Sequence, residues 1–160
     1  YRYPMFEEIQ HQLKQTKPFS SREEAVYLGI QIIADEQRAR FNDLFKSKDL
    51  TGAQYNVLRI LRGAGTAGIS CREIGERMIN RDSDITRMLD RLEARKLITR
   101  ERQTDDRRVV LTFISKAGLG LLAELDRPVE DLHRSLLGHL NEKELDSLLK
   151  LLGKAKQKKS

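Results

Sequence analysis

Residues 70–118, SCREIGERMINRDSDITRMLDRLEARKLITRERQTDDRRVVLTFISKAG, contain the order of elements that decides the fold. Ser70 and Glu73 match the S-x-x-E capping box, in which two side chains satisfy unpaired backbone N–H groups at the start of a helix. Ile74 and Met78 then supply an apolar side. The stretch is therefore expected to begin with a short amphipathic helix.

A second helix is expected after a break at residues 79–81. Asp82 or Ser83 is its expected N-cap, because either side chain can accept a hydrogen bond from an exposed N–H. Its apolar side repeats at i, i+4 and i+7 through Ile85, Leu89 and Leu92. The remaining positions carry groups that can hydrogen-bond base edges or phosphates, namely Ser83, Asp84, Thr86, Arg87 and Arg91.

A β-hairpin is expected after the second helix. Residues 96–102 alternate polar and β-branched side chains, residues 103–106 are turn formers, and residues 109–114 are β-branched and aromatic. An isolated hairpin is marginal in water, so this one must pack on the helices. The order of helix, turn, helix and hairpin, with Arg107 and Arg108 after its tip, is typical of a winged helix-turn-helix, which places one helix in a DNA major groove.

The charge of this region favours a nucleic-acid partner without establishing one. Residues 81–108 contain eight arginines, one lysine and seven acidic residues, so nine basic against seven acidic residues leave a surplus of two. Arginine presents a planar fork of donors that suits phosphate and guanine. Function must then depend on where the arginines point. Two alternatives stay open: the helices form only an ordinary core, or the winged helix binds a protein or RNA without sequence-specific duplex binding.

Three motifs resemble the MarR family of bacterial winged-helix regulators. Residues 50–58, LTGAQYNVL, resemble the family's L-T-x-x-Q-x-x-V-L motif, and residues 83–92, SDITRMLDRL, resemble its recognition helix S-x-V-T-R-L-V-D-R-L. Residues 106–118 have the length and frame of its D-R-R wing followed by L-T-x-x-G, with Ile114-Ser115 in place of Leu-Thr. Asp84 departs from the small hydroxyl residue that is frequent in the family. A carboxylate there would repel phosphate while accepting from a cytosine amino group.

The resemblance implies roles for residues in DNA binding. The helix with Ser83, Thr86, Arg87 and Arg91 would lie in the major groove, and Arg107 and Arg108 would belong to the basic wing. Arg108 would reach the minor groove, where narrow A·T-rich segments attract arginine. Asp106 would hold Arg108 in place by a salt bridge. An ordinary turn acid is the alternative reading of Asp106.

The chain is expected to form one MarR-like domain over residues 1–160, mostly α with a small β-wing. Residues 50–118 would be the winged helix-turn-helix, and residues 1–46 and 119–158 a helical dimerisation region. Apolar stripes support this division, with Val26, Ile30, Ile33, Phe41 and Leu44 on one side of the lobe and Leu122, Leu125, Val129, Leu132, Leu136 and Leu140 on the other. Because a single winged domain gives such stripes little to cover, we expect them to pack across a two-fold axis. A monomeric helix bundle is the alternative.

Four local features carry further expectations. A last helix with Leu145, Leu148, Leu149 and Leu152 is expected after residues 141–144, and residues 6–13 would add a short arm. Pro128 should kink or break the long stripe that contains it, because its ring clashes with the carbonyl four residues earlier. Residues 63–68 are glycine-rich, but no lysine follows them, so they predict a turn before a small first strand rather than a phosphate-binding loop.

Composition limits the function classes. The 160 residues carry a net charge of +6, no apolar run reaches the roughly 20 residues of a membrane span, and one cysteine excludes an internal disulfide. With no visible secretory signal, we expect a cytoplasmic, nucleoid-associated protein, although the chain starts at Tyr1 and an upstream piece could be missing. His11, His133 and His139 are far apart and follow no nucleophile motif, so we expect no enzyme, metal or cofactor.

The resemblance suggests a double-stranded, near-palindromic operator, a homodimer, and a small aromatic or phenolic acid, or an oxidant, as the releasing signal. Tyr27, Phe41, Tyr55 and Arg59 are candidates for an effector pocket, although their spacing proves nothing. Cys71 is the candidate oxidant sensor, since a helix N-terminus and Arg72 would favour its thiolate. The alternative is a small residue packed at a helix start.

Overall fold

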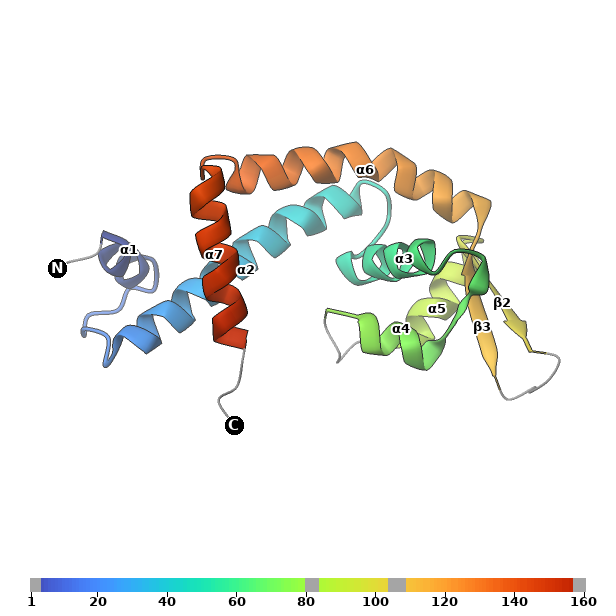
Figure 1. The fold of residues 1–160 in the computed structure, drawn as a ribbon, viewed down its shortest axis with the longest axis horizontal. Coiled ribbons are helices and arrows are strands. Elements are labelled where there is room, and N and C mark those ends of the chain that lie inside the picture. The colour runs from blue at the N-terminus through green and yellow to red at the C-terminus, as the bar shows by residue number, and fades with distance from the viewer. Residues whose placement is uncertain (1–3, 80–83, 104–108, 157–160) are drawn as a thin grey trace.

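The computed structural model describes residues 4–79, 84–103 and 109–156, and Ser83, Asp106, Arg107 and Arg108 lie outside these ranges. The described chain is mostly helical with a small antiparallel sheet, which confirms the expected fold class (Figure 1). Its elements in chain order are α1 (Pro4–Gln12), α2 (Arg22–Lys46), α3 (Gly52–Ala64), the 3-10 turn η1 (Gly65–Ala67), β1 (Ile69–Ser70), α4 (Cys71–Arg77), α5 (Ile85–Ala94), β2 (Ile98–Arg102), β3 (Val110–Ile114), α6 (Lys116–Leu137) and α7 (Glu142–Lys156).

Side-chain caps fix where the helices begin. Ser70 and Glu73 form the predicted reciprocal capping box at α4, and Thr51 and Gln54 form a second one at α3. The prediction of Asp82 or Ser83 as the N-cap of α5 was wrong. Asp84 is the cap, because its carboxylate accepts from the backbone N–H of Arg87 at 3.1 Å.

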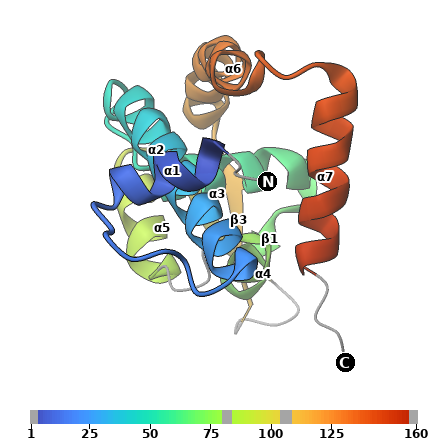
Figure 2. The same cartoon turned by 90° about the vertical axis from the view of Figure 1, so that its left-hand side faces the viewer.

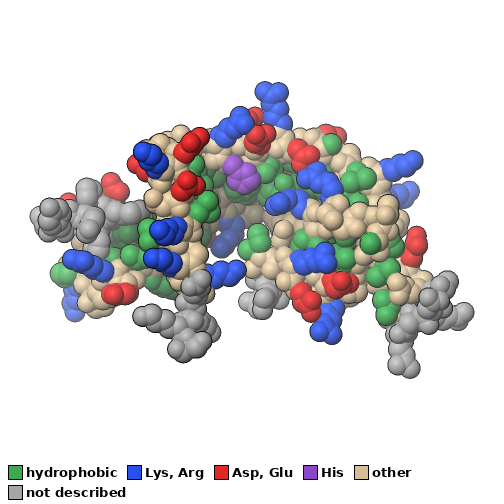
Figure 3. All heavy atoms as spheres, viewed as in Figure 1, with side chains coloured by type: hydrophobic (Ala, Val, Ile, Leu, Met, Phe, Trp, Pro, Cys, Tyr) green, Lys and Arg blue, Asp and Glu red, His purple; other side chains and the backbone are tan. Residues whose placement is uncertain are grey.

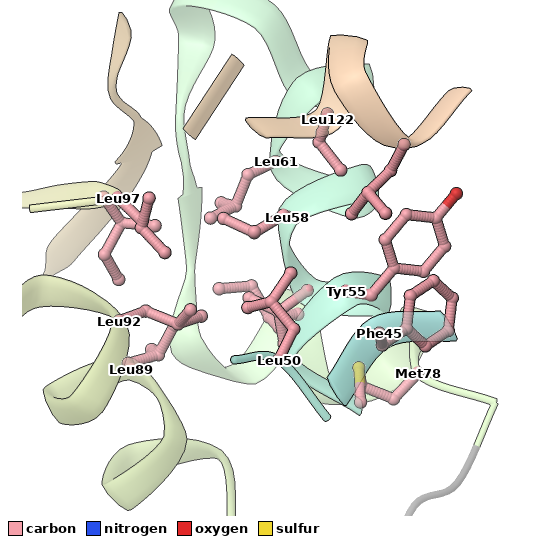
Figure 4. Packing of buried hydrophobic residues seen from close by; sticks show 14 of the residues in the cluster. Phe45, Leu50, Tyr55, Leu58, Leu61, Met78, Leu89, Leu92, Leu97 and Leu122 are labelled. Carbon is pink, nitrogen blue, oxygen red and sulfur yellow. The ribbon is translucent and has the colours of Figure 1, made fainter. Parts of the chain in front are cut away.

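The core joins α3, α4, α5 and α6 into one winged lobe (Figure 4). Leu58 and Leu61 of α3 contribute fully buried side chains, and Leu122 does so from α6. Leu89 and Leu92 of α5 belong to the same cluster. The predicted apolar side of α5 therefore faces the core, which leaves the opposite side of this helix in solvent.

The wing is a three-stranded antiparallel sheet in the order β1-β3-β2. Ile98 pairs with Ile114 and Arg102 with Val110, as expected for the hairpin. The glycine-rich segment forms the predicted turn before the small strand β1. Gly68 has φ +62°, and a Cβ there would lie 2.4 Å from Cε1 of Phe113, so this position requires glycine.

Pro128 does not break α6, which runs without interruption from Lys116 to Leu137 (Figure 1). Of the predicted kink or break, the break is therefore excluded, and the kink stays a prediction. Leu125 and Val129 are buried on the inner side of α6, whereas Pro128 lies on the exposed side. Water can satisfy the Glu124 carbonyl, which has no N–H donor at Pro128.

The long helices α2 and α6 lead from the winged lobe to the opposite end of the molecule, where α1 and α7 lie (Figure 1). Ile9 of α1 is buried and approaches Gly29 of α2, so the N-terminal segment does pack as a short helix on α2. Figure 2 shows α7 set apart from α1 and α2. In the described chain no residue of α7 is buried. No described helix is both long and apolar enough for a membrane span.

Candidate DNA-binding surface

The exposed side of α5 carries the residues that the sequence assigned to base and phosphate contacts. Thr86, Arg87 and Arg91 are exposed on this helix, and the two arginines lie opposite Leu89 and Leu92 in the core. Arg87 and Arg91 are one helical turn apart and so share a face. The structure therefore brings together all of the predicted contacts of α5 that fall within its described residues.

The two arginines of this face differ in their partners. Nε of Arg87 lies 3.8 Å from a carboxylate oxygen of Asp84, and both side chains are more than half exposed. The Arg91 side chain is exposed, and its guanidinium has no hydrogen-bond or ion-pair partner among the described residues. Asp84 itself holds the first turn of α5 as its cap, a structural role that the sequence analysis did not assign to it.

Arg100 connects the wing to α5. Its guanidinium donates to Glu93 through Nε at 2.9 Å and also through Nη2, and Nη2 donates to Asp90 at 2.7 Å. Its side chain is 27% exposed. The hydrogen bond to Glu93, with a smaller contribution from Asp90, raises the pKa of the Arg100 guanidinium above its ordinary value. Arg100 thus sets the position of β2 relative to α5.

Arg95 and the start of α6 hold the C-terminal end of α5. The Arg95 guanidinium donates to the backbone carbonyls of Lys48 and Asp49, in the turn between α2 and α3. Oγ of Ser115 donates to the Lys96 carbonyl at 2.7 Å. Gly118 lies so close to this segment that a Cβ would come within 2.3 Å of the Leu97 carbonyl oxygen.

These contacts separate the structural arginines from the available ones. Arg95 and Arg100 have partners 46 and 7 residues away, respectively. Sequence reasoning counted both only as part of a basic surplus, because contacts between separate elements leave no local pattern. The potential for anion binding on α5 therefore comes from Arg87 and Arg91.

Comparison with known proteins identifies the family of this chain. The sequence profile of the MarR family matches residues 50–110. The multiple antibiotic resistance protein MarR of Salmonella typhimurium is 31% identical over 134 residues, which is 82% of this chain and 92% of that protein. The HTH-type transcriptional repressor MdtR of Bacillus subtilis is 33% identical over 93 residues, 58% of this chain, but the match spans only 59% of MdtR.

The chain belongs to the MarR family. It is a DNA-binding transcriptional regulator with a winged helix and not an enzyme, as the sequence predicted.

Solved structures of other proteins have the same fold. A cysteine-to-serine mutant of MarR from E. coli, complexed with operator DNA, superimposes with a TM-score of 0.73 at 29% identity, covering 84% of this chain and 96% of that one. Bordetella bronchiseptica BpsR, whose DNA binding is regulated by 6-hydroxynicotinic acid, gives a TM-score of 0.73 at 27% identity, covering 82% and 98%.

Three of the four candidate effector residues of this MarR-family chain lie close together. The rings of Phe45 and Tyr55 stack with centroids 4.2 Å apart, Phe41 stacks on Phe45, and Arg59 lies over the Tyr55 ring at 5.9 Å. Tyr55 is buried in the core, and this burial raises the pKa of its hydroxyl. Tyr27 is 61% exposed and lies 14 residues from Phe41 on α2, roughly 21 Å along the helix axis.

Cys71 is half-buried at the first position of α4 and packs against the core. This position fits the alternative that the residue has a packing role. The ring of His133 contacts Phe41 with centroids 5.1 Å apart. Within the described ranges no group of three or more histidine, cysteine or acidic side chains has the arrangement of a metal site.

Proposed function

We propose that this MarR-family chain is a homodimeric, sequence-specific repressor of transcription that a small molecule releases from its operator. The observation that carries the proposal is the two-sided nature of α5. Leu89 and Leu92 fix one side in the core, Arg100 and Arg95 hold the helix in place, and the other side presents Thr86, Arg87 and Arg91 to solvent. A rigid helix with exposed donors suits a DNA major groove.

Exposed apolar side chains at the end remote from the wing support the homodimer. Val26, Ile30 and Ile33 of α2 are 40–60% exposed, and Leu149 and Leu151 of α7 are 68% and 63% exposed. Figure 3 shows a hollow beneath α6, between α7 and the winged lobe, with hydrophobic side chains along it. A second copy would bury these surfaces. We assign residues 1–46 and 119–158 to this interface and residues 50–118 to DNA binding.

In the proposed complex, α5 and the wing contact different grooves of the DNA. In this proposal Ser83, Thr86, Arg87 and Arg91 contact the major groove, and Asp84 accepts from a cytosine amino group. Arg107 and Arg108 contact the backbone and minor groove from the wing, with Asp106 orienting Arg108. In a two-fold dimer the paired α5 helices lie about 34 Å apart and read half-sites of a near-palindrome one helical turn apart.

Two relatives support repression and release. MdtR is named a repressor, and DNA binding by BpsR is regulated by 6-hydroxynicotinic acid, a small aromatic acid. We propose an effector of this class, an aromatic or phenolic acid, that acts where the dimer helices meet the winged lobes. A regulator of chromosomal genes would act at the nucleoid in the cytoplasm.

Selection of bound duplexes from a random DNA library tests the proposal, with Arg108→Ala run in parallel. We expect an enriched near-palindrome in the wild-type pool and weaker enrichment, most of all for A·T-rich flanks, with Arg108→Ala. If a folded dimer enriches no sequence at modest salt, the proposal fails, and a protein or RNA partner becomes the better account.

A further inference from the structure

A small hollow lies between the start of α3 and the exposed side of α5. Its lining combines the capping box of α3 with the basic face of α5, and consists of Thr51, Gln54, Asp84, Arg87, Met88 and Arg91. The core holds both walls, since Leu50 beside α3 and Leu89 of α5 belong to one buried cluster. Both walls of the hollow are therefore part of the packed lobe.

Gln54 places an unused hydrogen-bond donor at the hollow. The residue is only 7% exposed, and its Oε1 accepts from the backbone N–H of Thr51 at 2.9 Å. Its amide nitrogen has no acceptor among the described residues. In that part of the chain every fully enclosed side-chain nitrogen or oxygen has a partner, so this amide nitrogen is not fully enclosed, and Gln54 is one of the residues that line the hollow. The donor is therefore free to bind an acceptor that enters the hollow in place of water.

The surroundings of this donor favour an anion. The first turn of α3 contains no acidic residue, and the backbone N–H groups of Gly52 and Ala53 have no acceptor in the described chain. The N-terminus of a helix attracts negative charge through these free N–H groups and its dipole. Arg91 is unpaired among the described residues. The carboxylate of Asp84 is the one acid of the lining; it accepts from the backbone N–H of Arg87 and lies 3.8 Å from Nε of Arg87, which offsets part of its charge.

We propose that this hollow binds one phosphate group of the operator backbone, held by the Gln54 amide nitrogen and the Arg91 guanidinium, with Arg87 at the rim. The inference rests on the proposed function. If α5 lies in a major groove, the side of α5 that faces α3, where the hollow lies, is next to the phosphate backbone that borders the groove. Phosphate contacts fix the register of a recognition helix without reading sequence. Gln54 then determines where along the duplex Thr86 and Arg87 meet the bases.

Gln54→Glu is the variant that isolates this contact. Glutamate serves as well as glutamine at the third position of a capping box, so the start of α3 is preserved, while a donor is replaced by a carboxylate that repels phosphate. We expect binding to the selected operator and to non-specific duplex to weaken by roughly tenfold or more, as for a lost hydrogen bond to a charged group. Thr66→Glu makes the same charge change at an exposed site in η1, at the opposite end of α3 from the hollow, and should bind as the wild type does.

A scan with methylphosphonate linkages locates the phosphate. One backbone phosphate at a time is made neutral, and the affinity of wild type and Gln54→Glu is measured for each duplex. At the contacted position in each half-site we expect the wild type to weaken and the difference between the two proteins to shrink. An equal difference at every position would contradict the proposal. Arg91→Gln should couple to the same position, which keeps the test valid if Gln54→Glu lowers the melting temperature.

Titration of the DNA-free protein with inorganic phosphate separates the two sources of the anion. If phosphate binds tightly and depends on Gln54, but the scan finds no coupled position, the hollow is a site for a free anion and the backbone assignment is overturned. If the wild type selects no duplex, the proposed function fails and this inference fails with it. If the wild type binds its operator and Gln54→Glu binds equally well, the inference alone fails.

Discussion

At the scale of single residues, Arg100 illustrates how an ion pair acquires a positional role. Surface ion pairs contribute little, but Arg100 donates to both Asp90 and Glu93, and its side chain is 27% exposed. Its two partners lie on α5 and Arg100 itself on β2. The network therefore sets the angle between the recognition helix and the wing.

Replacing Arg100 should cost more than replacing an ordinary surface arginine. We expect Arg100→Met to lower the free energy of unfolding by about 1–3 kcal/mol, because two carboxylates lose a charged hydrogen-bond partner. Urea unfolding measures the loss. Arg72→Met is the control, since Arg72 is 88% exposed and its one ion-pair partner among the described residues is Glu76 of the same helix. It should change stability by less than about 0.5 kcal/mol. Equal effects of the two variants would contradict a special role for Arg100.

Lys96 is a residue in a strained conformation. Its φ is +58°, a region that costs a residue with a Cβ roughly 1–2 kcal/mol, while its N–H still donates to the Glu93 carbonyl at 2.8 Å. Lys96→Gly should therefore raise the midpoint of urea unfolding, with a gain of up to about 1 kcal/mol. Lys143→Gly, inside α7, should lower stability instead. A loss with Lys96→Gly would show that the lysine side chain outweighs the strain.

At the scale of elements, the winged lobe is held together by close backbone contacts. The start of α6 meets the segment after α5 at Gly118, where a Cβ would lie 2.3 Å from the Leu97 carbonyl oxygen. Gly120, two positions later in α6, has no neighbour within 4 Å of its Cβ position. The same substitution should therefore act in opposite directions at these two glycines.

Gly118→Ala should destabilise the lobe by about 1–3 kcal/mol, since a carbonyl cannot yield to the added methyl group. Gly120→Ala should stabilise it by up to about 1 kcal/mol through helix propensity. Thermal unfolding of the two variants checks both signs. If both alanines stabilise the protein, the close approach of α6 to Leu97 is not tight in solution.

The elements also show which parts of this structure a sequence can predict. Capping boxes and strand pairs depend on neighbours a few residues apart, and the cap at Ser70 and the hairpin around residues 98–114 were predicted correctly. The cap of α5 was misplaced because Asp82, Ser83 and Asp84 are all good capping residues. Pro128 was expected to kink or break a helix because its exposure was not known. Arg100 could not be assigned, since its role depends on elements that meet only in the folded lobe. The capping box of Thr51 and Gln54 has a local T-x-x-Q pattern and was overlooked.

At the scale of the whole molecule, the winged lobe and α7 differ in how deeply their apolar side chains are buried. The winged lobe encloses a core, whereas Leu148, Leu149, Leu151 and Leu152 of α7 remain 37–68% exposed in the described chain. Such a helix is not stabilised by its own protomer. Its stability should depend on the concentration of a second copy.

Leu149→Glu should dissociate the dimer while leaving the winged lobe folded. A charge in an interface core costs far more than one at the surface, so sedimentation should show a shift to the monomer at concentrations where the wild type is dimeric. Lys150→Glu, on the charged side of α7, should remain dimeric. Dimers of equal stability in both variants would place the interface elsewhere.

Half-site spacing tests the central claim most directly, which is that two α5 helices of one dimer read one operator. The affinity of the wild type is measured for the selected near-palindrome and for the same duplex with five base pairs inserted at its centre, which rotates one half-site by about half a helical turn. We predict that the insertion reduces affinity to the level of non-specific duplex, with two chains bound per unmodified operator. Unchanged affinity after the insertion would contradict the account.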